Sequence, residues 1–196
     1  VYTYDWTDQD GNAVTANDQG NLENIGAGTY TAVVTDENGC SDTVTVEITE
    51  NEPISISEEP SDYTGSGVSC NGQTDGFIDL TTTGGTQVYT YDWTDQDGNA
   101  VTANDQGNLE NIGAGTYTAV VTDENGCSDT VTVEITENEP ISISEEPSDY
   151  TGSGVSCNGQ TDGFIDLTTT GGTQVYTYDW TDQDGNAVTA NDQGNL

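Results

Sequence analysis

Short runs of the chain alternate apolar and polar residues, which is the pattern of β-strands that bury one face. We expect strands at residues 54–57, 77–82, 88–93, 116–122 and 130–136. The run at 88–93 places Tyr89, Tyr91 and Trp93 on one face, where they form the largest apolar surface in the pattern. We therefore predict that Trp93 lies in a hydrophobic core.

Turn residues separate these runs. We expect hairpin turns at Asp95–Gly98 and Asp123–Gly126, because each has polar residues followed by a glycine that can adopt the left-handed conformation of a G1 bulge. No stretch shows helical periodicity over the length that a helix needs. About six to eight short strands in a module of this size are typical of an all-β, immunoglobulin-like β-sandwich.

The sequence repeats itself without change. The segment that begins VYTYDWTDQDGNAVTANDQGNLENIGAG at Val1 returns at Val88 and begins again at Val175, so the period is 87 residues. A fixed period indicates an array of small modules rather than one large domain. We interpret the chain as tandem immunoglobulin-like modules, divided into the C-terminal part of one module (1–51), a complete module (52–138) and the N-terminal part of the next (139–196).

The modules are joined by a short linker. Only Asn138, Glu139 and Pro140 separate the last expected strand of one module from the first of the next. Proline restricts its own backbone and that of the preceding residue. We predict a stiff joint and an extended rod, in which each module adds about 40 Å if its longest strands run about 12 residues.

The charge balance limits the partners. The chain has 36 Asp and Glu residues and no Lys, Arg or His. This charge repels phosphate backbones and anionic lipid headgroups, so we expect no nucleic-acid binding and no direct membrane insertion. No apolar stretch is long enough to span a bilayer. A charged chain of low hydrophobicity can be disordered, but the alternating runs and specific turns argue for a folded module whose partners are cations and neighbouring modules.

The cysteines indicate an oxidising, extracellular setting. The four are Cys40, Cys70, Cys127 and Cys157, and no histidine is available to complete a zinc site with them. Cys70 and Cys127 fall within one module, and we predict a disulfide between them. The alternative is a bond between neighbouring modules, because the two turns of an immunoglobulin-like topology that hold these residues lie at opposite ends. Cys40 and Cys157 have no partner in these residues.

An ordered set of motifs resembles a known family. The motifs are SCNG, DGFIDL, GG, YTYDW and GAGTYTAVVTDENGC, followed by a last alternating strand. Together they resemble the SprB repeat of gliding-motility adhesins, which are giant surface proteins of Bacteroidota. The GTYTAVVTD stretch is similar to polycystic-kidney-disease-type modules. The resemblance implies a β-sandwich building block of a long, secreted cell-surface protein that carries an adhesive end.

Acidic turns are the candidate metal sites. Calcium binds six to eight hard oxygen ligands, which carboxylates and amides supply. The candidates are Asp95, Asp97, Asn99, Asp123, Glu124 and Asn125. Their spacing is not that of an EF-hand. The preference of hairpin turns for Asp, Asn and Gly is the simpler explanation of these residues.

Two threonines are candidate glycosylation sites. Asp42-Thr43-Val44 and Asp129-Thr130-Val131 resemble the short acceptor pattern for O-glycans of Bacteroidota secreted proteins, so Thr43 and Thr130 would carry the glycan. The alternative is that each is an ordinary solvent-facing threonine of a strand.

The sequence favours a structural function over catalysis. Without His or Lys, general acid–base and nucleophilic chemistry lack their usual basic groups, so we expect no enzyme and no required cofactor. The leading interpretation is a stalk section of an adhesin, and the alternative is a module that assembles laterally into a filament or sheath. A carbohydrate-binding module would need Tyr63 and Tyr150 to be exposed.

Overall fold

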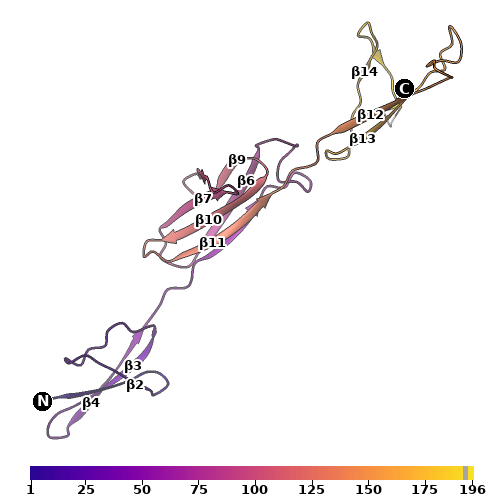
Figure 1. Ribbon diagram of the computed structural model, residues 1–196. Helices are drawn as coiled ribbons and strands as arrows, with labels where there is room; N and C mark the ends of the chain where they lie inside the picture. The colour runs from indigo at the N-terminus through magenta and orange to yellow at the C-terminus, as the bar shows by residue number, and fades with distance from the viewer. Residues whose placement is uncertain (192–193) are drawn as a thin grey trace. The chain divides into compact units, whose positions relative to one another are not determined.

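The computed structural model describes residues 1–191 and 194–196, and every regular element in them is a β-strand (Figure 1). The described residues form two compact units, Val1–Pro53 and Ile54–Leu196. None of their segments is a helix long and apolar enough to cross a membrane. The predicted all-β class is therefore confirmed.

The central part of the second unit is an immunoglobulin-like sandwich of two antiparallel sheets. Its strands are β5 (Ser55–Pro60), β6 (Gly76–Thr83), β7 (Tyr89–Asp95), β8 (Ala100–Val101), β9 (Leu109–Ile112), β10 (Gly115–Asp123) and β11 (Ser128–Ile135). One sheet has the order β11-β10-β7-β8, and the other has the order β5-β6-β9. Both sheets are visible in the middle of Figure 1.

The hydrophobic core lies between these two sheets. Trp93 on β7 is 2% exposed, which confirms that it is a core residue. It packs in one buried cluster with Val68 of the loop before β6 and with residues of both sheets, namely Ile78, Leu109, Ile112, Tyr117, Ala119, Val133 and Ile135. The expected alternation holds at residues 117–121 of β10 and 132–135 of β11, where buried residues alternate with residues that are exposed or partly exposed.

The two predicted hairpin turns are present. The N–H of Gly98 donates to Asp95 O at 3.0 Å, and Gly98 has a φ of 80°. The N–H of Gly126 donates to Asp123 O at 3.0 Å, and Gly126 has a φ of 83°. Glycine occupies both positions because other residues rarely adopt this left-handed conformation.

The first unit contains only one of the two sheets. Its strands are β1 (Thr3–Thr7), β2 (Ala13–Val14), β3 (Gly28–Thr35) and β4 (Ser41–Ile48), in the order β2-β1-β3-β4. This is the sheet order of β8-β7-β10-β11, formed by the same residues one period earlier. The face that is covered in the central sandwich is open here: Val46 is 41% exposed, whereas the equivalent Val133 is 5% exposed.

The remainder of the second unit repeats the beginning of the sandwich. Its strands are β12 (Ser142–Pro147), β13 (Ile165–Thr170), β14 (Trp180–Thr181) and β15 (Ala187–Val188). β12 pairs with β13 in the register of β5 with β6. Ile165 and Leu196 exchange two backbone hydrogen bonds at 3.0 Å, at the position where β6 meets β9 in the central sandwich.

Candidate functional site

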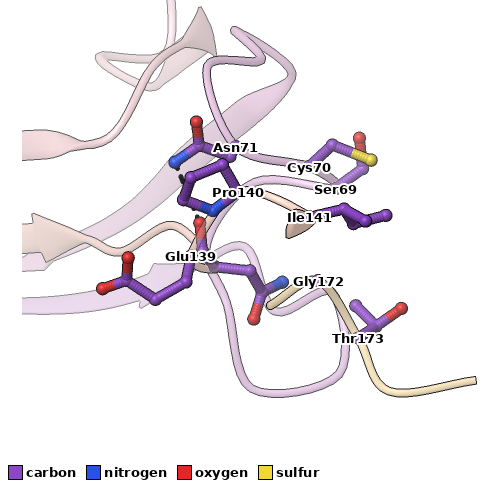
Figure 2. A pocket seen from close by; sticks show the side chains of 9 residues that line it. Ser69, Cys70, Asn71, Glu139, Pro140, Ile141, Gly172 and Thr173 are labelled. Atoms are coloured by element: carbon purple, nitrogen blue, oxygen red, sulfur yellow. Dashed lines mark hydrogen bonds between the residues drawn. The ribbon is translucent and has the colours of Figure 1, made fainter. Parts of the chain in front are cut away.

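A cavity lies where the central sandwich meets the following repeat. It has a volume of about 270 Å³. Residues of the loop before β6, of the linker and of the loop after β13 line it: Ser69, Cys70, Asn71, Asn138, Glu139, Pro140, Ile141, Gly172 and Thr173. In Figure 2 the Cys70 and Ile141 side chains both extend toward the right of the view.

Hydrogen bonds hold the linker on both sides of this cavity. On the side of the central sandwich, Asn71 Nδ2 donates to Asn138 O at 2.9 Å, and the N–H of Gly72 donates to Glu137 Oε2 at 2.7 Å. On the other side, the N–H of Gly172 donates to Glu139 O at 2.8 Å. A Cβ atom at Gly171 would lie 2.1 Å from Pro140 O. Only glycine at this position therefore lets the linker backbone approach so closely. The linker is therefore part of the folded structure.

The central sandwich has two distinct ends. Ile54 and Asp123 both lie against Gly85, since a Cβ atom there would be 2.9 Å from Ile54 Cγ1 and 2.8 Å from Asp123 Oδ2. We call this the incoming end, because the chain enters β5 here. At the other end of β11 the N–H groups of Gly67 and Val68 donate to Thr136 O, at 2.9 and 3.2 Å. We call this the outgoing end, because the chain leaves toward the linker here.

The structure separates Cys70 and Cys127. Cys127 directly precedes β11 at the incoming end, whereas the loop of Cys70 is bonded to Glu137 and Asn138 beyond the outgoing end of that strand. The eight residues of β11 alone span about 27 Å. A disulfide requires Cα atoms within about 7 Å of each other. The predicted bond between these two residues is not formed here, and all four cysteines are free and exposed.

Asp95 organises its own hairpin turn. Its Oδ1 accepts hydrogen bonds from the N–H groups of Asp97 at 2.9 Å and Asn99 at 2.8 Å, and its Oδ2 accepts one from Asn99 Nδ2 at 3.0 Å. The Asn99 amide, followed by the backbone N–H donors, holds the pKa of the Asp95 carboxyl below its usual value. Much of the hydrogen-bonding capacity of this carboxylate is therefore used by the turn.

Asp123 connects its own hairpin turn with the loop between β6 and β7 at the incoming end. Its Oδ1 accepts from the N–H groups of Asn125 at 3.0 Å and Cys127 at 2.8 Å, and its Oδ2 accepts from the N–H of Thr86 at 2.9 Å. The Thr86 N–H is the main reason that the pKa of Asp123 lies below its usual value. Asp123 is 6% exposed. Sequence reasoning identified its turn but missed the contact with Thr86, because no local pattern links residues so far apart.

The six candidate calcium ligands occupy two separate turns. In the pairing of β7 with β10, Asp95 lies opposite Tyr117 and Asp123 lies opposite Tyr89, so the two turns are at opposite ends of the sheet. Asp97, Asn99, Glu124 and Asn125 are exposed. Among the described residues, no three His, Cys, Asp or Glu side chains gather as a metal-binding group. Calcium binding at either turn stays a prediction.

The two candidate glycosylation sites lie on exposed strand positions. Thr130 is on β11 opposite Val120, and Thr43 is on β4 opposite Val33. Both threonines are exposed, and in each case the backbone N–H donates to the preceding aspartate at 2.8 Å. Their modification stays a prediction.

The tyrosines of the carbohydrate-binding alternative are partly exposed. Tyr63 is 36% and Tyr150 is 38% exposed. Each hydroxyl donates to a backbone carbonyl 12 residues ahead, at Asp75 and Asp162, over 3.0 Å. Each ring is therefore tied to its own loop.

Comparison with known proteins gives one family match. The family model described as "SprB repeat" matches residues 65–98 and 152–185. These residues include the SCNG, DGFIDL, GG and YTYDW motifs of two successive repeats. No curated protein matches the chain.

Among solved structures, the chain is similar to the crystal structure of the N-terminal eight Ig domains of Down Syndrome Cell Adhesion Molecule, isoform 1.30.30. The sequence identity is 16% and the TM-score is 0.35. The match covers 98% of this chain and 26% of that one, so this chain spans about a quarter of its length.

Proposed function

Because the chain carries SprB repeats in tandem, we propose that it is a stalk section of a long extracellular cell-surface adhesin. In this proposal the identical modules supply reach, and the binding specificity lies elsewhere in the protein. Adhesion or gliding motility is the process that such a stalk serves. The proposal assigns no catalysis, and it is consistent with a sequence that contains no His or Lys.

One observation carries the proposal: the chain enters the central sandwich at one end and leaves at the other. Ile54 lies at the incoming end against Gly85, and Thr136 lies at the outgoing end against Gly67. A module of this kind adds its own length to an array each time it is repeated. A module that the chain entered and left at the same end would instead widen the array without lengthening it.

The charge supports a stalk over the alternative of a laterally assembled filament. With 36 Asp and Glu residues and no Lys, Arg or His, two parallel chains repel each other along their whole length. The same charge opposes binding to anionic surfaces and attracts cations. Like charges on neighbouring stalks favour separate, extended chains.

Small-angle scattering tests the proposal on chains that differ by whole repeats. We expect the maximum dimension to rise by a constant increment of about 40 Å for each added repeat, because the strands run along the direction of the chain. A compact assembly would grow only with the cube root of its mass. Growth of that kind would contradict the stalk.

Sedimentation over a wide protein concentration range tests the alternative. A stalk section stays monomeric, whereas a filament or sheath module associates as the concentration rises. Deletion of whole repeats from the native protein provides the test on cells. We expect a shorter reach and weaker attachment with unchanged ligand specificity. A change of specificity would assign binding to the repeats themselves.

A further inference from the structure

The cavity at the joint suggests a partner for Cys70. Within the central sandwich, Cys70 and Cys127 lie at opposite ends and cannot reach each other. Both thiols are nevertheless exposed, and each lies at an end where another repeat follows or precedes. A partner for Cys70 must therefore come from the part of the following repeat that lies near it.

The incoming end of the central sandwich shows what lies there in a complete module. The N–H of Thr86 donates to Asp123 Oδ2 at 2.9 Å, and the N–H of Asp123 donates to Cys127 O at 2.9 Å. The N–H of Cys127 donates to the other oxygen of the same carboxylate, Asp123 Oδ1, at 2.8 Å. Because one carboxylate accepts from both residues, the backbone nitrogens of Cys127 and Thr86 lie within about 8 Å of each other.

The following repeat begins in the same way. Thr173 and Gly172 occupy the positions of Thr86 and Gly85 one period later. A Cβ atom at Gly172 would lie 2.8 Å from Ile141 Cγ1, and one at Gly85 would lie 2.9 Å from Ile54 Cγ1, so this local packing is the same in both repeats. The equivalents of Asp123 and Cys127 in that repeat would thus lie beside Thr173.

Cys70 lines the same cavity as Gly172 and Thr173. The cavity also contains the side chain of Asn138, whose Nδ2 is buried and has no hydrogen-bond partner in the described part of the chain. The joint therefore presents a free thiol and an unused amide donor, and Figure 2 shows Cys70 in the same pocket as Gly172 and Thr173 of the following repeat.

We propose that Cys70 forms a disulfide with the cysteine that occupies the position of Cys127 in the following repeat. This inference goes beyond the proposed function, because it concerns how successive modules are joined. In each repeat the cysteine at the position of Cys70 thus bonds to the following repeat, and the cysteine at the position of Cys127 bonds to the preceding repeat. The loop of Cys70 and the hairpin turn are exposed, so their tips can move the last few ångströms that the bond requires.

The bond forms by thiol–disulfide exchange with an external disulfide oxidant. The Cys70 thiolate attacks the oxidant, forms a mixed disulfide and releases one oxidant sulfur as a thiol. The thiolate of the following repeat then attacks Cys70 Sγ and displaces the second oxidant sulfur. The two protein thiols lose two protons and two electrons, and the oxidant disulfide becomes two thiols.

The test uses the chain of residues 1–196 extended at its C-terminus by a second copy of residues 110–138, which completes the third repeat. The test variant has Cys40, Cys127 and Cys157 replaced by serine, so that only Cys70 and the added cysteine remain. The matched control has Cys40, Cys157 and the added cysteine replaced by serine, so that only Cys70 and Cys127 remain. Both variants are incubated with oxidised and reduced glutathione, alkylated, and analysed by intact mass and non-reducing peptide mapping.

We expect near-complete loss of two hydrogen atoms and of both alkylation sites in the test variant, with the peptides of the two cysteines joined. The control should retain two alkylated thiols. Tryptophan fluorescence shows whether both variants are folded, because Trp93 is buried in the folded sandwich. A bond between Cys70 and Cys127 in the control would overturn the proposal. Two free thiols in a folded test variant, or a bond that joins separate chains, would overturn it as well.

Discussion

Replacing Trp93 with alanine removes the largest side chain of the central core. The indole is 2% exposed, and its Nε1 donates to Gly107 O at 2.8 Å. On β7 it lies opposite Ala119 of β10 and Val101 of β8, so the cavity that it leaves is bounded by strands that cannot easily close in. Large-to-small substitutions of buried aromatic residues cost about 3 to 5 kcal/mol.

This loss is large compared with the stability of the module. A domain of about 85 residues has a free energy of unfolding of about 4 to 13 kcal/mol. We therefore expect Trp93→Ala to lower the unfolding midpoint in guanidinium chloride strongly, or to unfold the sandwich outright. Trp93→Phe separates the two contributions. It keeps a ring in the core but leaves Gly107 O without its donor, which costs about 1 to 3 kcal/mol.

The chain contains its own control. Trp6 occupies the same position one period earlier, with the same sequence neighbours and the same kind of hydrogen bond, from Nε1 to Gly20 O at 2.9 Å. It is only partly buried, because the first unit lacks the second sheet. Circular dichroism should show a much smaller effect of Trp6→Ala than of Trp93→Ala on the main unfolding transition. Equal effects, or a loss below about 1 kcal/mol for Trp93→Ala, would refute the assignment of Trp93 to the core.

Three further predictions concern turns and charge. Gly107→Ala should lower the melting temperature more than Gly98→Ala. Both positions have positive φ, but only the Cβ at Gly107 would meet the Tyr91 ring, at 2.5 Å, which adds about 1 to 3 kcal/mol to the loss of stability. Equal shifts in melting temperature would argue against this contact. The lowered pKa of Asp123 stabilises the fold above the usual value of 3.8, and this contribution is lost as the pH falls through the folded pKa. Asp123→Asn should thus be less stable than the parent at pH 7, with a difference that shrinks below about pH 4, and a constant difference in pH-dependent unfolding would contradict the argument. Added salt should raise the melting temperature by screening the repulsion between carboxylates. If the turns bind calcium, calcium should raise it further than sodium chloride of equal ionic strength does. Coincident melting curves in the two salts would contradict the predicted calcium sites.

Much of the fold follows from local sequence. The alternation along β7, β10 and β11 specifies which residues share a face, because side chains of a strand point to opposite sides in turn. Asp95 and Gly98 specify a hairpin for an equally local reason, since the carboxylate accepts the N–H groups of its own turn. The strand β9 (Leu109–Ile112) was not predicted, because it has only four residues and its two apolar residues do not alternate with polar ones. Its pairing with β6 stabilises it.

The candidate sites were predicted less completely than the strands. The cysteines and acidic turns were identified by residue type alone. Which of them lie together depends on the order of strands in the sheets. Cys70 and Cys127 are separated by the full length of β11, whereas Thr86 and Asp123 are brought into contact by the pairing of β7 with β10.

The repeated sequence separates what the residues determine from what the tertiary structure determines. Val46 and Ile48 have the same neighbours in sequence as Val133 and Ile135, and they lie on strands of the same length in sheets of the same order. Local sequence therefore determined the strands, their register and the face that each residue occupies. Burial differs: Ile48 is 38% exposed and Ile135 is 1% exposed. Only the second sheet, β5-β6-β9, removes that face from water, because burying an apolar face requires an opposing surface that a single sheet lacks.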